Sequence, residues 1–324
     1  MGKDKIQQKS AGGGTCAFQI AYAAIVTGAT GYIGGHLVRA LLSEKHEVYV
    51  ILRMHSNLSL LPDEICKNEH FHVYRYAEYG SLLGIFREIT ARNAHFILFH
   101  LAANVISGDH PHEGIPSLMS SNLTFGTVLV DAAVRTGVYD VVFTGTYWQY
   151  TGGATYHPLN LYAATKKAFE DILQYYEDAE DLHVMTLLLY DTYGPAVGAK
   201  KRTKLLDYLR DHARETITVA LSPGEQRLNY VYIDDVIAAY LRAGNLLARG
   251  SYDLCGEYAV RGMETLSLRK IVEMFLSLSN AQARIQWGGR PYRRREMMIP
   301  CDSIPLLPGW KPQVTLEDGL RRIL

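Results

Sequence analysis

Tyr162 and Lys166 are the residues of this chain whose types and spacing best suit acid–base chemistry. They lie four positions apart in a segment with helical apolar spacing, so both side chains project from one face of a helix. A free phenol has a pKa of about 10, and a neighbouring ammonium favours its ionised form. We therefore predict that Lys166 brings the pKa of Tyr162 toward neutrality and that Tyr162 exchanges a proton with substrate.

A Tyr-x-x-x-Lys pair is common by chance, and two other features give this one its meaning. Thr146 precedes it at the end of a strand-like apolar run, where a hydroxyl suits a bond to a substrate oxygen. A glycine-rich segment lies near the N-terminus. In this order, the features favour an active site in which a bound dinucleotide meets Thr146, Tyr162 and Lys166.

The glycine-rich segment places Gly28, Gly31 and Gly34 between the apolar run Ile25-Val26 and a helical pattern. Glycine permits a sharp turn and a close ligand, and the free N–H groups at a helix start bind anions such as pyrophosphate. The usual dinucleotide fingerprint has the spacing G-x-G-x-x-G, so an ordinary strand–helix turn is the alternative. A second strand-like run, 47–52, completes a βαβ unit and favours dinucleotide binding.

Arg53 follows this second run and bears on the choice of nicotinamide cofactor. An NAD site would be expected to have Asp or Glu there to hold the ribose 2′-hydroxyl, but the first acidic residue after the run is Asp63. A guanidinium forms charge-assisted hydrogen bonds with a 2′-phosphate, which a carboxylate would repel. The sequence therefore favours NADP(H) over NAD. The alternative is that Arg53 is a solvent-facing residue at a strand end.

Further strand-like runs at 95–99, 141–143 and 185–189 alternate with helical patterns. They contain few alternating polar residues, which is typical of strands buried on both faces of a sheet. The order predicts an α/β fold, a doubly wound parallel (Rossmann) sheet with a smaller C-terminal α/β lobe. Ligands of such sheets lie at the carboxyl ends of the strands.

This order also suggests how the chain divides. We expect residues 1–20 to be a flexible extension and residues 21–195 to be the dinucleotide-binding domain. Residues 196–324 would form mainly the substrate-binding lobe, with about 225–245 returning to the first domain.

The composition, 48% hydrophobic and 20% charged, is ordinary for a soluble globular protein. The formal net charge is +0, so no global field favours nucleic acid or an anionic membrane. The 4 cysteines are widely spaced, which argues against a disulfide framework or zinc site and fits a reducing cytoplasm. We expect no membrane span, because no long apolar run occurs, and no metal site, although His110 and His112 lie close together.

These features together resemble the extended short-chain dehydrogenase/reductase family, most of whose members act on nucleotide-activated sugars. The resemblance runs from about Ala23 to Leu324, nearly the whole chain. Its motifs are Thr27-Gly-Ala-Thr-Gly-Tyr-Ile-Gly34, His100-Leu-Ala-Ala-Asn104, Asn122, Thr146, Tyr162, Lys166, Tyr193-Gly-Pro195, Tyr230-Val-Tyr-Ile-Asp-Asp-Val236 and Gly309-Trp-Lys-Pro312. The segments around Thr146, Tyr162 and Asp191 are similar to the CDP-abequose and CDP-paratose synthase type, NADPH-dependent reductases of a 4-keto deoxysugar nucleotide.

The resemblance implies reduction of the C4 ketone of a nucleotide-linked 4-keto-deoxyhexose, CDP-linked, in deoxysugar biosynthesis. Tyr162 would protonate the developing alkoxide, Lys166 would hold the nicotinamide ribose, and Thr146 would donate a hydrogen bond to the substrate oxygen. The expected cofactor-binding residues are Gly28, Thr30, Gly31, Tyr32, Ile33, Arg53, Leu101, Ala102, Ala103, Thr144, Tyr162 and Lys166. The expected substrate-binding residues are Asn104, Tyr147, Trp148, Asp191, Lys204, Arg227 and Arg293.

Departures from the family pattern separate the activities. Dehydratases of this family have an Asp-Glu pair directly after the catalytic Thr or Ser, whereas Tyr147 and Trp148 stand there. Epimerases typically have Arg directly before Asp-Tyr, and here Arg227 comes one position early. An epimerase with tightly bound NAD is the first alternative and a non-catalytic NADPH-binding regulator the second. Tyr76 lies near where many relatives have an Asp that contacts adenine.

Members of the family are commonly dimers through the helix that carries the catalytic Tyr and the helix before it, so the resemblance implies a homodimer. The apolar positions Phe169, Ile172, Leu173 and Tyr176 suit such an interface, but core packing explains them equally well. For the basic substrate-binding candidates, a solvated surface is the alternative. The sequence leaves open whether the nucleotide is CDP or dTDP and which stereochemistry the new hydroxyl takes.

Overall fold

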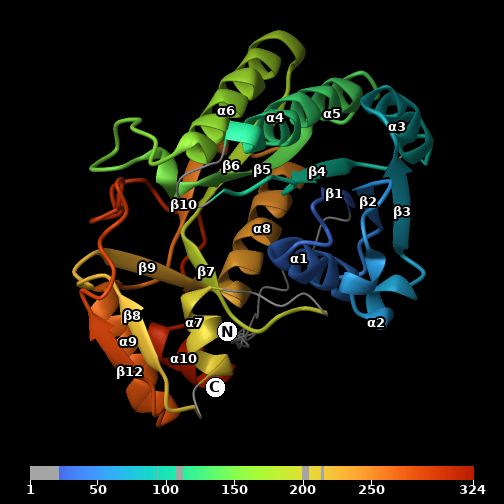
Figure 1. Cartoon of the computed structure of the whole chain (residues 1–324). Coiled ribbons are helices and arrows are strands. Elements are labelled where there is room, and N and C mark those ends of the chain that lie inside the picture. Colours follow the sequence, from blue (N-terminus) through green and yellow to red (C-terminus); the bar gives the residue numbers. More distant parts are fainter. Residues whose placement is uncertain (1–21, 93, 107–111, 199–203, 213–214) are drawn as a thin grey trace, which may run out of the picture.

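A seven-stranded sheet lies at the centre of the structure, a computed structural model that describes residues 22–92, 94–106, 112–198, 204–212 and 215–324 (Figure 1). Its strand order is β10-β6-β5-β4-β1-β2-β3, and all neighbours are parallel. The strands are β1 (Ala23–Thr27), β2 (Val48–Arg53), β3 (Phe71–Tyr76), β4 (Phe96–His100), β5 (Asp140–Thr146), β6 (His183–Leu189) and β10 (Gly256–Val260). This doubly wound sheet confirms the predicted fold class. The extension expected at residues 1–20 lies outside the described residues.

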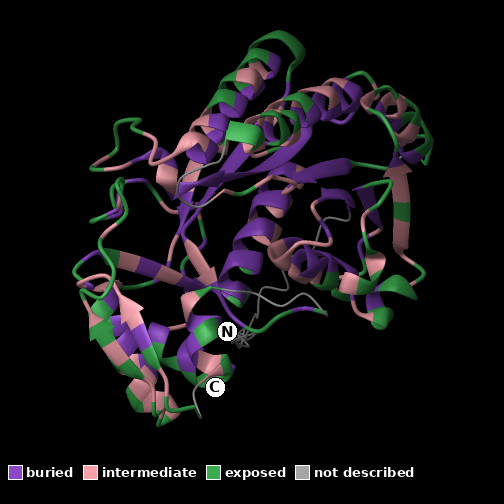
Figure 2. Ribbon diagram, in the orientation of Figure 1, coloured by how far each residue is buried: buried purple, intermediate pink, exposed green. Residues whose placement is uncertain are grey.

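Helices cover both faces of the sheet (Figure 1). One face carries α1 (Tyr32–Ser43) and α8 (Ile233–Ala248), and the other carries α3 (Leu82–Thr90), α4 (Ile115–Met119), α5 (Phe125–Val134) and α6 (Leu161–Glu180). Each face has its own cluster of buried apolar side chains. The central strands are buried along their whole length (Figure 2), which explains why their sequences are apolar runs without alternation.

The two outermost strands, β3 and β10, lack the apolar runs by which the other strands were predicted. Both lie at an edge of the sheet, and most of their residues are only partly buried. Less of their surface needs apolar side chains, so hydrophobic patterning gives them a weak signal. A short helix, α2 (Asp63–Cys66), lies between β2 and β3. Because β10 comes from residues 256–260, a segment beyond the expected 225–245 joins the central sheet, and the predicted domain bounds stay a prediction.

The glycine-rich turn connects β1 to α1 with little space around its backbone. Gly28 has a φ of 75°, in the left-handed region, and a Cβ there would lie 2.8 Å from the backbone nitrogen of Ala102. A Cβ at Gly34 would lie 2.2 Å from the Gly28 carbonyl oxygen. Glycine is therefore required at Gly28 by backbone conformation and at Gly34 by packing of the helix on the turn. The turn brings the start of α1 beside the end of β4.

A smaller lobe continues from the end of β6 (Figure 1). Its strands form a three-stranded sheet in the order β11-β9-β7 and a two-stranded sheet of β12 and β8. The strands are β7 (Asp191–Tyr193), β8 (Thr218–Leu221), β9 (Arg227–Tyr232), β11 (Thr265–Ser267) and β12 (Arg284–Trp287), and the helices are α7 (Leu205–Asp211), α9 (Leu268–Ser279) and α10 (Leu316–Ile323). The lobe therefore begins at the carboxyl edge of the central sheet, where ligands of this fold bind.

Helix α6 begins at Leu161, directly before the Tyr-x-x-x-Lys pair. The side chain of Asn160 caps it by accepting a hydrogen bond from the backbone N–H of Ala163 at 2.9 Å. Phe169, Leu173 and Tyr176 of this helix are buried in the chain's own core. Core packing thus explains these apolar positions, and the homodimer stays a prediction.

Candidate active site

Two adjoining cavities open at the carboxyl ends of the central strands. The larger, which we call the Tyr162 cavity, has a volume of about 450 Å³, and the other, which we call the Arg53 cavity, has a volume of about 340 Å³. Gly28, Gly31 and Leu101 line both of them. Every residue predicted to bind cofactor lines at least one of the two. The fold therefore brings together residues that are spread from the first strand to α6.

Tyr162 and Lys166 line the Tyr162 cavity from the first turns of α6, and both are almost fully buried. Burial raises the pKa of Tyr162 and lowers the pKa of Lys166 to about 7, while the Glu170 carboxylate acts on Lys166 in the opposite direction. Our prediction that Lys166 draws the pKa of Tyr162 downward is therefore wrong for this structure. The physical reason is that both groups are desolvated, so each favours its neutral form.

The ammonium nitrogen of Lys166 lies 4.7 Å from the ring centroid of Phe143, a contact that offsets part of its desolvation. His100 of the neighbouring strand β4 is buried, and its Nδ1 forms a hydrogen bond with the hydroxyl of Thr27 at 2.8 Å. Burial lowers the pKa of His100 to about 3, with Lys166 acting in the same direction. The ring is thus neutral at physiological pH, and it serves to join β1 and β4 beneath the cavities.

Thr146 ends β5 and lines the same cavity. Its hydroxyl oxygen accepts a hydrogen bond from the backbone N–H of Trp148 at 3.3 Å, which leaves the hydroxyl hydrogen to donate to a ligand. Thr144 lies two residues earlier on the strand, and its hydroxyl bonds that of Tyr240 at 2.6 Å. Both threonines therefore hold a fixed place at the strand end.

A buried polar network holds the turn after Thr146 from behind. The side-chain oxygen of Gln149 accepts from the backbone N–H of Thr146 at 3.0 Å, and its amide nitrogen donates to both oxygens of Glu170 at 3.1 and 3.2 Å. Lys167 bridges Glu170 at 3.0 Å and Glu257 of β10 at 2.9 Å. Burial, and next the hydrogen bond to Glu257, raises the pKa of Glu170. Sequence patterning missed this network, because its members are ordinary polar residues in three separate elements.

Four residues expected to bind substrate, Tyr147, Trp148, Asp191 and Lys204, also line the Tyr162 cavity. The Tyr147 hydroxyl donates to Asp191 at 2.7 Å, and the Tyr147 ring stacks on Tyr190 at a centroid distance of 4.4 Å. Burial raises the pKa of Asp191. Trp148 meets the Tyr162 ring edge to face at 6.1 Å. Aromatic surface and one hydrogen-bonded carboxylate therefore face the catalytic candidates, and Lys204 also lines this cavity.

Three predicted substrate residues lie outside both cavities. The backbone N–H of Asn104 donates to the side chain of Asn122 at 2.7 Å, and its amide donates to Ser117 at 3.2 Å. Arg227 is exposed and donates to the carbonyl of Thr265 at 2.6 Å. Arg293 is also exposed. Asn104 thus has a bonding partner within the fold, and binding roles for these three residues stay predictions.

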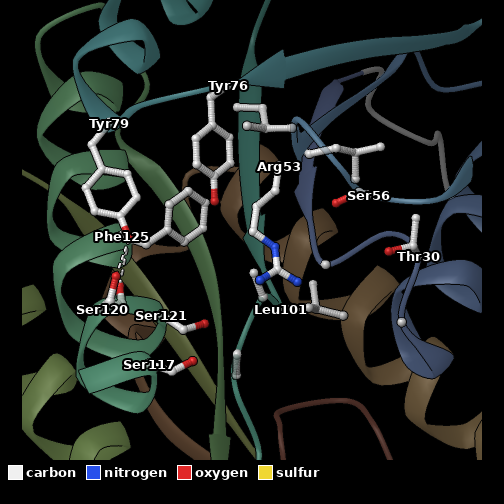
Figure 3. Close-up of a pocket in the computed structure, with 16 residues that line it drawn as sticks. Thr30, Arg53, Ser56, Tyr76, Tyr79, Leu101, Ser117, Ser120, Ser121 and Phe125 are labelled. Atoms are coloured by element: carbon white, nitrogen blue, oxygen red, sulfur yellow. Dashed lines mark hydrogen bonds between the residues drawn. The ribbon is translucent and has the colours of Figure 1, made fainter. Parts of the chain in front are cut away.

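The Arg53 cavity has a polar wall and an aromatic wall (Figure 3). The Arg53 side chain extends into it, with the hydroxyls of Thr30 and Ser56 on one side. Tyr76, Tyr79 and Phe125 form the other side; Tyr76 stacks on Phe125 at 5.1 Å, and burial raises its pKa to about 12. Among the described residues lining this cavity, Arg53 is the only charged one. The sequence analysis named Tyr76 near an adenine-contacting position of relatives, but it assigned no binding role to Ser56, Tyr79 or Phe125.

The described part of the chain contains no group of three or more His, Cys, Asp or Glu side chains that suits a metal ion. His110 lies outside the described residues. No described helix is long and apolar enough to cross a membrane.

Comparison with known proteins places this geometry in context. A family model described as the NAD dependent epimerase/dehydratase family matches residues 24–253. The chain is 27% identical to the CDP-abequose synthase of Yersinia pseudotuberculosis, over 85% of this chain and 90% of that protein. It is 26% identical to the UDP-glucose 4-epimerase of Mycolicibacterium smegmatis, over 92% of this chain and 96% of that protein. A solved structure of UDP-glucuronic acid 4-epimerase from Bacillus cereus, in complex with UDP-glucuronic acid and NAD, superposes with a TM-score of 0.76 at 21% identity, covering 93% and 97% of the two chains.

Proposed function

The chain belongs to the NAD dependent epimerase/dehydratase family, and we propose that it reduces the C4 ketone of a nucleotide-linked 4-keto-deoxyhexose with NADPH. We take a CDP-linked substrate as the preferred one, because a CDP-abequose synthase is among its relatives. The observation that carries the proposal is the charge of the Arg53 cavity, where Arg53 is the only charged residue among those described. A cofactor that is oxidised and released in each turnover suits a reductase.

The residues of the Arg53 cavity fit a 2′-phosphorylated cofactor. A 2′-phosphate is dianionic near neutral pH and needs a cation and hydrogen-bond donors, which Arg53, Thr30 and Ser56 would supply. A carboxylate, which would bond a 2′-hydroxyl and repel the phosphate, is absent from the described lining. The glycine turn at Gly28 and the start of α1 would hold the pyrophosphate.

The residues around the Tyr162 cavity would perform the proton half of the reaction. When bound, NADPH supplies the hydride for the carbonyl carbon. Tyr162 would give its phenolic proton to the carbonyl oxygen, and its raised pKa keeps that proton in place at neutral pH. Thr146 would donate a hydrogen bond to the same oxygen while charge develops there. Lys166 would orient the nicotinamide ribose from the same face of α6.

The residues after Thr146 argue against elimination of water. Tyr147 is an aromatic residue hydrogen-bonded to Asp191, and Trp148 packs against Tyr162. Neither offers the carboxylic acid and carboxylate pair with which the dehydratases of this family eliminate water. The reductase therefore accounts for the residues present better than a dehydratase does.

The test is to offer CDP- and dTDP-4-keto-6-deoxyglucose and a CDP-3,6-dideoxy-4-ketosugar side by side with NADPH. We expect stoichiometric loss of NADPH absorbance with one of them, and the substrate that reacts identifies the nucleotide. Failure of all three, with NADPH binding intact, would contradict 4-ketoreduction.

An epimerase is the second candidate, because a UDP-glucose 4-epimerase matches over 92% of this chain. An epimerase recycles a cofactor that it never releases. Denaturing the purified protein and assaying the supernatant separates the two functions. Release of stoichiometric NAD would favour epimerisation, whereas a cofactor-free protein that binds NADPH would favour the reductase.

A further inference from the structure

Arg75 of β3 holds the turn that follows β2 from outside the Arg53 cavity. Its Nη1 donates to three backbone carbonyls, those of Arg53 at 3.2 Å, Met54 at 2.8 Å and Ser56 at 3.0 Å. Arg75 is paired with Leu52 in the sheet and does not line the cavity. One guanidinium nitrogen thus ties together the turn whose first and last residues, Arg53 and Ser56, line the Arg53 cavity (Figure 3).

Two backbone bonds complete this turn. The N–H of Met54 donates to Tyr76 at 3.0 Å, and the N–H of Ser56 donates to Arg53 at 2.9 Å. With the backbone held at these points, the direction of the Arg53 and Ser56 side chains follows from the turn's conformation. A longer or more mobile turn would have to lose conformational entropy to place the same groups around a phosphate.

Arg75 also changes the charge behind the cavity. Three carbonyl oxygens gathered at one place present the negative ends of their dipoles, which would disfavour a phosphate nearby. The guanidinium of Arg75 donates to all three of these carbonyls, so its positive charge compensates their dipoles. It therefore contributes to the positive potential at Arg53 without touching the ligand.

We propose that Arg75 is a positioning residue that sets the preference for an adenosine ribose bearing a 2′-phosphate. The proposal rests on the proposed use of NADPH. It attributes the selectivity of Arg53 for a 2′-phosphate to the turn that Arg75 holds. It predicts that an Arg75 variant loses this preference even though Arg53, Thr30 and Ser56 are still present in the cavity wall.

The test is calorimetric titration of the full chain with 2′,5′-ADP and with 5′-AMP, which differ by the 2′-phosphate. We expect the wild-type protein to bind 2′,5′-ADP more tightly than 5′-AMP. Arg75→Met should lower the affinity for 2′,5′-ADP about tenfold, as expected for the loss of hydrogen bonds from a charged group. Binding of 5′-AMP should change by less than about twofold, because the aromatic wall is untouched. Arg75→Lys, which keeps the charge but not the planar fork, should give an intermediate loss.

Two controls make the outcome decisive. Arg87→Met removes one exposed arginine of α3 that lines neither cavity, and it should leave both affinities unchanged. Retained 5′-AMP binding shows that Arg75→Met has folded, and Arg75→Lys provides a second variant if it has not. A wild-type preference that survives in Arg75→Met, or an equal loss of both ligands, overturns the role of Arg75 alone. No preference in the wild-type protein overturns NADPH use itself.

Discussion

Tyr162 and Lys166 lie on one face of α6 in a desolvated site, and burial moves their pKa values apart, that of Tyr162 upward and that of Lys166 downward. At neutral pH the phenol keeps its proton and the ammonium loses part of its charge, so Tyr162 is suited to act as an acid and not as a base. This direction suits a reaction that ends by protonating an alkoxide. It suits less well a reaction that must begin by removing a hydroxyl proton.

Removal of the Tyr162 hydroxyl should therefore remove the acid without removing the cofactor site. We expect Tyr162→Phe to lower kcat by about 10²–10⁴ with the substrate that turns over, since that is the usual contribution of a positioned proton donor. NADPH affinity should stay close to that of the wild type, measured by fluorescence titration. Tyr156→Phe, at an exposed tyrosine, is the matched control. A near-normal rate in Tyr162→Phe would eliminate this residue as the acid.

Lys166 should cost the protein stability, and the cost should depend on pH. Its folded pKa of about 7 lies below the ordinary value of 10.5. Below the folded pKa the protein bears the full cost of a buried cation, and the cost is relieved as pH rises toward 10.5. We expect Lys166→Met to raise the free energy of unfolding by about 1–4 kcal/mol near pH 6 and by much less near pH 10.

Urea denaturation at the two pH values measures this difference. Lys67→Met is the control, because Lys67 is an exposed lysine directly after α2 whose ion pair is with the exposed Asp63. If Lys166→Met raised the unfolding free energy equally at both pH values, or lowered it near pH 6, the cost assigned to the buried Lys166 cation would be contradicted.

At the scale of elements, the site depends on how β5, α6 and β10 are joined. Gln149 lies in the turn after β5, and Glu170 lies on α6 one turn beyond Lys166. Their hydrogen bonds fix the backbone N–H of Thr146, and the hydroxyl of Tyr150 donates to Glu257 at the other end of the same turn. The network therefore joins the Thr146 turn to α6, the helix that carries Tyr162 and Lys166.

Breaking this network should change catalysis more than cofactor binding. Gln149→Leu leaves the Thr146 N–H without its acceptor and removes the amide donor to Glu170, which keeps Lys167, so we expect a loss of about 1–3 kcal/mol in unfolding free energy. We also expect about tenfold lower kcat, because a displaced Thr146 stabilises the transition state less. Glu170→Gln retains an acceptor for Gln149, so its losses of unfolding free energy and of kcat should be smaller.

NADPH affinity should be unchanged in these variants, because Gln149 and Glu170 line neither cavity. Steady-state kinetics with separate kcat and KM values, and chemical denaturation, provide the readouts. Gln174→Leu on the exposed side of α6 is the control. A kcat equal to that of the wild type in Gln149→Leu would show that Thr146 keeps its place without the network.

At the scale of the whole molecule, the Tyr162 cavity is a junction between the two parts of the chain. Thr146 and Tyr162 come from the central sheet and its covering helix, whereas Asp191 and Lys204 come from the start of the smaller lobe. The Arg53 cavity, by contrast, lies wholly in the first domain. The part of the cofactor that enters the Arg53 cavity should therefore bind without help from the lobe, and substrate should contact both parts.

Ligand binding to the folded state should make this cofactor preference visible in thermal stability. At equal concentrations, NADPH should raise Tm more than NADH, and a tenfold difference in affinity corresponds to about 1.4 kcal/mol. For a chain of this size we expect a difference of about 2 °C or more. Arg53→Gln should abolish the difference. Equal shifts with both cofactors in the wild-type protein would contradict selection of a 2′-phosphate.

Much of the fold followed from the sequence because its signals are local. The buried strands β1, β2, β4, β5 and β6 contain continuous apolar runs, and the helix that carries Tyr162 has the apolar spacing that predicts it. The glycine turn and the Tyr-x-x-x-Lys pair are spacings within a few residues. A local pattern of this kind can be interpreted without knowing what lies across the sheet.

Only the tertiary structure decided the surroundings of these groups. Gln149 meets Glu170 across 21 positions and Tyr150 meets Glu257 across 107, and nothing in the intervening residues encodes those contacts. The tertiary structure also decided the directions in which the pKa values of Tyr162 and Lys166 shift. Charge spacing along a helix predicted that the ammonium would govern the phenol, but the loss of water from both groups outweighs it. Desolvation depends on every neighbour in space, so it is determined only when the chain has folded.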